Sequence, residues 1–343
     1  MTAVQEVEEV LGRGQTTLAG LSSPRTRLFA RYLVGRITQA VVVLWLAYTL
    51  TFVAITLLPS NPIDMFAADD TGVIDPQTVE QMKLYYGYDH GVLQRYFIEL
   101  SHVVRGTLGY SMSTGQTVTQ AIGEAALPTL RLTVTAFAAA VLIATAIVST
   151  ATLTSRRWLR SLVVLLPPLF AAAPVFWVGI VVLNVLSFRL GWISAFPDGT
   201  FLSILVPSLV LGLPLSAALA QVLLKSVETV AHSDFVDVVR AKGAGKHWVF
   251  WRHVVRNAAG PGLTVAGTVL GTLVGGAVVT ETVFARAGIG RVLQTAVSQQ
   301  DVSLVQGFIL IIAGVYVVVN LVIDLLYPAL DPRILLTTGG ARG

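Results

Sequence analysis

Residues 234–261 read DFVDVVRAKGAGKHWVFWRHVVRNAAGP, a polar stretch between two long runs that contain no Asp, Glu, Lys or Arg. The run before it covers residues 201–224, and the run that it leads into covers residues 257–280. Each exceeds the ~20 residues with which a helix crosses the hydrocarbon core of a bilayer. A polar hairpin between two such runs indicates a membrane protein that presents this hairpin to a partner.

Uncharged runs of this length occur six times, and they decide the fold class. The chain of 343 residues is 54% hydrophobic and 12% charged, whereas a soluble domain has roughly 25% charged residues. The six runs are residues 37–58, 132–153, 161–188, 201–224, 257–280 and 302–323. We therefore expect an all-α polytopic membrane protein with six transmembrane helices. Prolines at positions 167, 168 and 174, and at 207 and 214, predict kinks in the third and fourth helices.

The basic residues between the runs indicate the orientation in the membrane, because Lys and Arg are enriched on the cytoplasmic side. One set of segments is rich in them: Arg25, Arg27, Arg31, Arg36, Arg156, Arg157, Arg160, Arg240, Lys242, Lys246, Arg252 and Arg256. The short loops on the opposite side are sparse, with Arg189 in one and Arg286 and Arg291 in another. Both termini and the polar hairpin are therefore expected in the cytoplasm. Membrane flanks account for these basic residues, so no nucleic-acid partner is expected.

The residue types for metal or covalent chemistry are sparse. The chain has no cysteine, which excludes disulfides and thiolate metal sites. The spacing of its five histidines does not match that of metal ligands: His90, His102, His232, His247 and His253. No nucleophile, nucleotide-binding or zinc motif occurs. We expect no catalytic residue, no metal site and no cofactor in this chain.

The runs and the polar segments between them predict the organisation of the chain. The expected segments are a cytoplasmic N-terminal extension and membrane flank (1–36), transmembrane helix one (37–58), an external helical insertion (59–126), a five-helix core (127–329) that contains a cytoplasmic loop (226–260), and a cytoplasmic tail (330–343). In the insertion, Asp75-Pro76 predicts the start of one helix, and the apolar spacing over residues 92–104 predicts a second. This external cap has two interpretations, a surface for a substrate-delivery protein or a seal over the outer mouth.

The hairpin pattern predicts two short helices. Asp234 is placed to cap the first, and Asp237 adds negative charge near its N-terminus. A helix of about two turns through Lys242 should end at Gly243 in the left-handed conformation. The second helix carries an apolar set that is able to lie against the membrane interface: Trp248, Val249, Trp251, Val254 and Val255.

Four polar residues near the ends of the fifth and sixth runs are further candidates for a functional or structural role. Thr280 and Glu281 lie at the outer end of the fifth run, which suggests an outer gate or a support for the segment before the sixth. Asn320 and Asp324 are four residues apart and share a helix face. We interpret them as a structural polar pair.

Several motifs in order resemble those of ABC-importer permeases. The polar hairpin, with Val239-Arg240-Ala241-Lys242-Gly243, then Arg252-His253-Val254-Val255-Arg256-Asn257 and Pro261, resembles the "EAA" loop in its dipeptide and oligopeptide permease form. The resemblance continues through Gly288-Ile289-Gly290-Arg291 and Asp331-Pro332-Arg333-Ile334, and covers about residues 29–334. Asp237, Val238 and Val239 stand where the general motif has Glu-Ala-Ala.

This resemblance implies a type I ABC importer permease fold of the dipeptide, oligopeptide and nickel class, as the first (B-type) of two permease subunits in the bacterial cytoplasmic membrane. It implies a second homologous permease, two cytoplasmic ABC ATPases that hold ATP and Mg²⁺, and an extracytoplasmic substrate-binding protein as partners. The implied ATPase-coupling residues are Asp237, Arg240, Ala241, Lys242 and Gly243. The expected substrate is a peptide, with a nickel chelate or another small solute as the alternative. A standalone carrier or channel is the competing function.

Overall fold

The computed structural model describes residues 24–57, 80–81, 83–84 and 90–330, without the side chains of residues 24–33, 274 and 323–330. The chain divides into two compact units, residues 1–46 and 47–343. In the first unit, the described residues belong to helix α2 (Pro24–Thr56), which continues into the second unit. Three expectations lie outside the described residues: the N-terminal extension before residue 24, the helix that starts at Asp75-Pro76, and the tail after residue 330.

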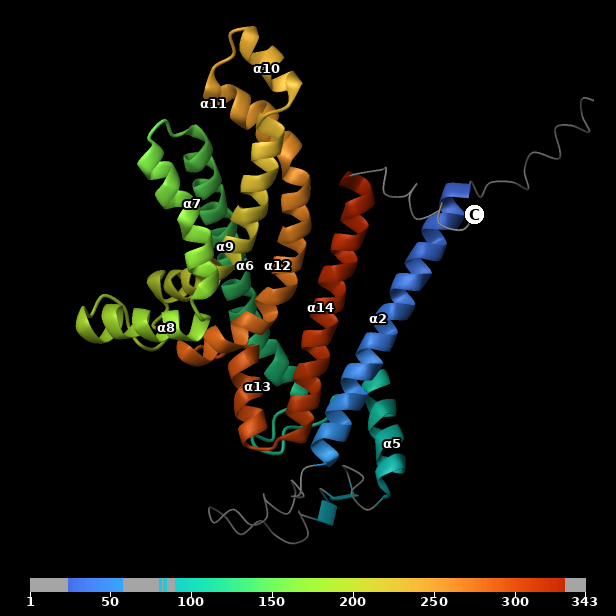
Figure 1. Cartoon of the computed structure of the whole chain (residues 1–343). Helices are drawn as coiled ribbons and strands as arrows, with labels where there is room; N and C mark the ends of the chain where they lie inside the picture. The colour runs from blue at the N-terminus through green and yellow to red at the C-terminus, as the bar shows by residue number, and fades with distance from the viewer. Residues whose placement is uncertain (1–23, 58–79, 82, 85–89, 331–343) are drawn as a thin grey trace, which may run out of the picture. The chain divides into compact units, whose positions relative to one another are not determined.

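The regular secondary structure in the described part of the second unit is helical, apart from an isolated β-bridge between Tyr110 and Thr117 (Figure 1). Its helices after α2 are α5 (Val92–Val104), α6 (Val118–Leu153), α7 (Arg157–Ala172), α8 (Val175–Leu183), α9 (Leu202–Ala231), α10 (Asp234–Ala241), α11 (Lys246–Val249), α12 (Val255–Val283), α13 (Ile289–Ser298) and α14 (Val302–Leu330). Two π-helical segments, η1 (Asn184–Arg189) and η2 (Phe250–Val254), extend α8 and connect α11 to α12.

Among the described residues, four helices are long and apolar enough to cross a membrane: residues 34–56 of α2, α6, α9 and residues 302–322 of α14. Two bent pairs raise the number to six if each pair forms one crossing. In one pair α7 meets α8 and η1 at 100°, and in the other Lys246–Leu273 meets Gly275–Val283 at 50°. The predicted all-α fold with membrane-spanning helices is confirmed. The predicted number of six spans is reached only if each bent pair is counted as one span.

The sharpest bend lies at one of the prolines in the third run. Pro174 precedes α8, and Ala173 before it has the extended conformation that a following proline favours (φ −86°, ψ 120°). Pro167 and Pro168 lie within α7, and Pro207 and Pro214 lie within α9, which still counts as one long span. The kink predicted for the third run therefore occurs at Pro174, and not at Pro167 or Pro168.

Helix α6 begins earlier than the charge-free run suggested. Its first residue is Val118, so residues 118–126, which were assigned to the external insertion, belong to the same helix as the second run. Thr117 caps this helix, because its hydroxyl accepts a hydrogen bond from the Gln120 backbone N–H at 3.3 Å. In the insertion itself, α5 forms where an amphipathic helix was predicted, and Tyr96 packs against Tyr48 and Phe52 of α2.

The core of the second unit is the contact between α6 and α9, which α12 extends (Figure 1). Small side chains line it: Ala136, Ala140 and Ala144 on α6, and Gly212, Ser216, Ala217 and Ala220 on α9. A Cβ on Gly212 would lie 2.8 Å from the Ala136 carbonyl oxygen. Small residues let helix backbones approach closely in a membrane, where dispersion contacts drive association.

Gly212→Ala should destabilise the protein by about 1–3 kcal/mol, the usual cost of overpacking a core. Gly260→Ala is the matched control, because a Cβ there meets no atom within 4 Å and alanine favours a helix over glycine by about 0.5–1 kcal/mol. Thermal unfolding of the purified variants should show a lower Tm for Gly212→Ala only. Equal Tm values would contradict the close helix approach.

Candidate functional site

The polar hairpin forms the short helix α10 at one end of the second unit, which we name the α10 end (Figure 1). Ser233, with an extended backbone (φ −83°, ψ 146°), occupies the N-cap position, and Asp234 is the first helical residue. The prediction of Asp234 as the cap is therefore wrong by one position. The Ser233 hydroxyl donates to the Val230 carbonyl at 2.6 Å and makes no capping bond. Asp234 and Asp237 both lie in the first turn, where carboxylates interact favourably with the helix dipole.

The end of α10 agrees with the sequence pattern. Lys242 is the C-cap residue, and Gly243 has φ +86°, the left-handed conformation that favours glycine. The Gly243 N–H donates to the Arg240 carbonyl at 2.9 Å. The predicted stop at Gly243 is confirmed, and it turns the chain back toward α11.

One side chain anchors α10 to the rest of the unit. Val236 is fully buried in an apolar cluster with Val227 of α9, Val249 of α11 and Phe250 of η2. The other face of α10 is exposed and mixes apolar side chains, Phe235 and Val238, with charged ones. This arrangement holds the helix in place and leaves a two-turn surface open.

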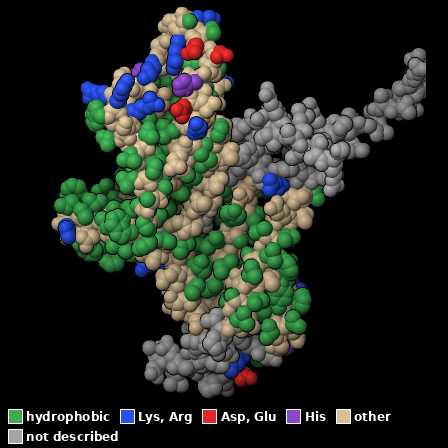
Figure 2. Space-filling model, viewed as in Figure 1, with side chains coloured by type: hydrophobic (Ala, Val, Ile, Leu, Met, Phe, Trp, Pro, Cys, Tyr) green, Lys and Arg blue, Asp and Glu red, His purple; other side chains and the backbone are tan. Residues whose placement is uncertain are grey.

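The five predicted coupling residues are all exposed at this end: Asp237, Arg240, Ala241, Lys242 and Gly243. Asp237 and Arg240 form an ion pair (Oδ1 to Nη1, 3.6 Å) with both side chains largely exposed. An exposed helix pair of this kind contributes only about 0.3–0.5 kcal/mol. Both side chains therefore stay free to form contacts with a partner. Figure 2 shows Lys, Arg, Asp, Glu and His side chains gathered at this end, above a broad hydrophobic zone.

The segment after α10 differs from the predicted second helix. It is continuous with α12 through η2, and its apolar residues do not share one face. Val249 and Val254 are buried, whereas Trp248 and Trp251 are exposed. The expectation that all five apolar residues are able to lie against the membrane interface is therefore wrong for the two buried valines. Lys246, at the start of α11, donates from Nζ to the Leu153 carbonyl at the end of α6 (3.0 Å).

A buried carboxylate lies at the opposite end, which we name the α13 end. Glu281 has no exposed surface, and it accepts hydrogen bonds from Thr129 Oγ1 (2.6 Å) and the Gly290 backbone N–H (2.7 Å). Thr129 Oγ1 also accepts from the Ile289 N–H at 2.8 Å. Glu281 thus binds the first turn of α13 to α6 and α12.

The other predicted polar residues have more local contacts. Thr280 is buried, and its hydroxyl donates to the Gly276 carbonyl of its own helix at 3.1 Å. The Asn320 amide donates to the Tyr316 carbonyl, also in its own helix, at 2.8 Å. The side chain of Asp324 lies outside the described residues, so the Asn320–Asp324 pair stays a prediction.

A second buried carboxylate at the α13 end was not predicted. Asp301 is fully buried and accepts at Oδ2 from Ser111 Oγ (2.6 Å), the Ser113 N–H (3.0 Å) and Ser113 Oγ (2.9 Å). Its Oδ1 accepts from the Leu304 N–H at 3.2 Å, so Asp301 also caps α14. One sequence signal was available, because an aspartate directly before an apolar run is a typical N-cap.

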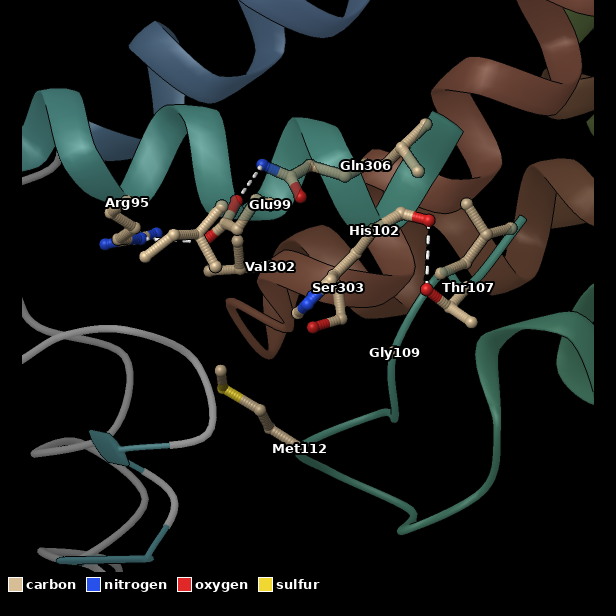
Figure 3. A pocket seen from close by; sticks show the side chains of 12 residues that line it. Arg95, Glu99, His102, Thr107, Gly109, Met112, Val302, Ser303 and Gln306 are labelled. Carbon is tan, nitrogen blue, oxygen red and sulfur yellow. Dashed lines mark hydrogen bonds and ion pairs between the residues drawn. The ribbon is translucent and has the colours of Figure 1, made fainter. Parts of the chain in front are cut away.

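A small cavity of about 60 Å³ lies beside the insertion helix α5 and the start of α14 (Figure 3). Glu99 lies between Arg95, whose Nε is 2.8 Å from Glu99 Oε1, and Gln306 of α14, which donates to Glu99 Oε2 at 3.3 Å. This network connects α5 to α14. Among the described residues, no three His, Asp or Glu side chains are placed to hold a metal ion.

Comparison with known proteins gives a consistent match. Residues 143–336 match the family model for "Binding-protein-dependent transport system inner membrane component". Three similar proteins are each named glutathione transport system permease protein GsiC, from Escherichia coli O6:H1, Escherichia coli strain K12 and Salmonella typhimurium strain LT2. Their identities over 303 residues are 31%, 30% and 31%, and each alignment covers 88% of this chain and 98% of the relative.

Thr129→Val should destabilise the α13 end, because it leaves the buried Ile289 N–H and one Glu281 oxygen without their partner. The expected loss is about 1–3 kcal/mol of unfolding free energy. Thr133→Val, on the same helix, is the control, since among the described residues that hydroxyl donates only to the Thr129 and Leu130 carbonyls of α6. Chemical unfolding should show a larger loss of unfolding free energy in Thr129→Val than in Thr133→Val. An equal loss of unfolding free energy in both variants would argue against the Glu281 network.

Gly243→Ala should loosen α10, since alanine in the left-handed conformation costs about 1–2 kcal/mol. Gly245→Ala is the matched control, because Gly245 has φ −68° and a Cβ there meets no atom within 4 Å. Hydrogen exchange of the α10 amides should accelerate about 5–30-fold in Gly243→Ala only. Unchanged exchange in that variant would contradict the turn geometry.

Proposed function

The chain belongs to the family of binding-protein-dependent transport system inner membrane components, and from this premise we propose that it moves peptides or peptide-like solutes, with α10 as the contact to partner ATPases. As a family member it is a non-catalytic permease subunit of an ABC importer of the peptide/nickel class, with the type I permease fold. It is a multi-pass protein of the bacterial inner membrane. The family implies a partner permease, an ATPase and a binding protein in general.

The geometry of α10 supports the coupling role most directly. A coupling helix must be held firmly by the membrane domain while it offers a surface to the ATPase. Val236 supplies the attachment, and Gly243 ends the helix after two turns. Phe235 and Val238 then present apolar surface beside Asp237 and Arg240. Apolar side chains at the centre with charged ones around them are typical of protein interfaces.

We place the α10 end and both termini in the cytoplasm, in keeping with the enrichment of Lys and Arg on that side. Two ATPases, with their own ATP and Mg²⁺, would then bind α10 of this chain and the equivalent helix of a second, homologous permease. The α13 end faces outward, where an extracytoplasmic binding protein delivers the substrate. ATP-driven approach of the two coupling helices opens the pathway between the permeases.

A structural role for Glu281 and Thr280 is better supported than a role as an outer gate. The Glu281 carboxylate is enclosed and hydrogen-bonded on both oxygens, and Thr280 bonds within its own helix. Neither side chain is exposed to a passing solute in this conformation. Glu281 therefore acts as the support of α13.

A peptide-like substrate is favoured by the names of the three relatives, which are glutathione permeases. Glutathione is a tripeptide, which is in keeping with the expected peptide class. A nickel chelate or another small solute is the alternative within this class of importer. Uptake assays with labelled glutathione, dipeptides, oligopeptides and nickel chelates, run with the native binding protein, distinguish them.

Val238→Asp tests the coupling assignment, because it places a charge at the centre of the exposed face of α10. Val297→Asp is the matched control, since Val238 is 54% exposed and Val297, on α13, is 56% exposed. Copurification of the ATPases should weaken about 30-fold or more in Val238→Asp, which corresponds to the ~2 kcal/mol of an interface hot spot. Membrane insertion should be unchanged. Normal ATPase binding in Val238→Asp, or equal loss in both variants, would overturn the assignment.

A further inference from the structure

A cleft of about 600 Å³ lies behind α10, on the side away from its exposed apolar residues. We name it the α10 cleft. It is lined from four directions by the end of α6, the first turns of α7, the end of α9 and the α10–η2 hairpin. Its polar lining residues are Thr152, Arg160, Ser161, Glu228, His232, Asp237, Arg240 and Lys246. Its volume falls in the range of ~300–1,000 Å³ that is usual for small-molecule sites.

The charges around this cleft favour an anion. The two acidic residues already have cationic neighbours, since Asp237 pairs with Arg240 at 3.6 Å and Glu228 with Lys225 at 3.9 Å. Lys246 donates one hydrogen bond, to the Leu153 carbonyl, and an ammonium has three donors. The Arg160 guanidinium makes no hydrogen bond or ion pair with any described residue. A guanidinium and an ammonium with free donors therefore line one cleft.

The apolar part of the cleft indicates what kind of anion fits. Val164, Leu224, Val227, Val249 and Phe250 line it beside the polar groups. A small inorganic anion would leave this apolar surface in contact with water. An amphiphile with a charged head and a hydrocarbon tail would cover both parts.

Helix α7 connects the cleft to the membrane. Arg160 and Val164 line the cleft, while Trp158, Leu162 and Leu165 of the same helix are exposed. An exposed Trp next to arginines at the start of an apolar helix is typical of the headgroup level of a bilayer. The cleft thus opens where the headgroups of the leaflet at the α10 end would lie.

We propose that the α10 cleft binds the phosphate headgroup of an anionic phospholipid, with Arg160 and Lys246 as the phosphate ligands. Arginine provides a fork of donors and lysine a compact charge, and both bind phosphate. Basic pockets between helices on the cytoplasmic side are known to hold lipid headgroups. The lipid would connect α7 to the hairpin that carries α10, so its presence would stiffen the coupling surface. This inference rests on the proposed function for the orientation of the cleft.

The test uses the full importer complex with its ATPases, purified in mild detergent and analysed by native mass spectrometry after addition of phosphatidylglycerol. The wild type should retain the lipid. Arg160→Gln and Lys246→Gln should each bind it about fivefold more weakly, the effect of removing one cation near an anionic headgroup, ~1 kcal/mol. Lys246→Arg should restore binding. Arg156→Gln is the control, because Arg156 lies in the same basic cluster but does not line the cleft.

Three outcomes would overturn the proposal. An equal loss of phosphatidylglycerol binding in Arg156→Gln and Arg160→Gln would show that the lipid is held by the overall basic charge of the surface and not by the cleft. Binding of phosphatidylcholine as tight as that of phosphatidylglycerol would exclude a charged headgroup site. Displacement of the lipid by inorganic phosphate, together with equal retention of phosphate alone, would assign the cleft to a free anion. ATPase copurification, measured on the same samples, is expected to persist in Arg160→Gln, so failure of the lipid site is distinguishable from failure of the coupling assignment.

Discussion

The close contact between α6 and α9 is the constraint on which the rest of the second unit depends. Alanines, Gly212 and a 2.6 Å hydrogen bond between Thr135 and Ser208 bring the two backbones together. Dispersion forces need this proximity in a membrane, where the surrounding lipid is as apolar as the helices. Helix α6 then holds α13 through Thr129 in its first half, and its Leu153 carbonyl, at its last residue, accepts a hydrogen bond from Lys246. The α10 hairpin and the Glu281 support of α13 are therefore attached to one helix.

Much of the helical architecture is readable from uncharged runs, because a backbone in hydrocarbon must satisfy its own hydrogen bonds. The limits of the helices are less readable. The second uncharged run begins after Arg131, yet α6 begins earlier in the chain, at Val118. Residues 118–126 pack against α13 and α14 within the protein, so this part of the helix does not need to be free of charged residues. The 100° bend after α7 follows from Pro174, but Pro207 and Pro214 are equally visible in the sequence and lie within one long helix. Local sequence marks possible breaks, and tertiary packing selects among them.

The α10 hairpin was predictable because its determinants are local: Asp237 near the start of the helix and Gly243 in the left-handed conformation at its end. The buried carboxylates were less predictable, because their partners are far away in the chain. Glu281 meets Thr129 across 152 residues, and Asp301 meets Ser111 across 190. No periodicity connects such pairs. The α10 cleft was missed for the same reason, since four separate segments line it.

The length of α6 has a mechanical consequence. Its 36 residues correspond to about 54 Å of helix length, well beyond the ~30 Å thickness of a hydrocarbon core. Tilting a helix of this length by about 5° at one end displaces the other end by up to about 5 Å, close to one helical turn. The Lys246 contact lies at one end of this lever, and Thr129 lies in its opposite half. A small angular movement of the hairpin would thus appear at the α13 end as a displacement large enough to change which side chains meet there.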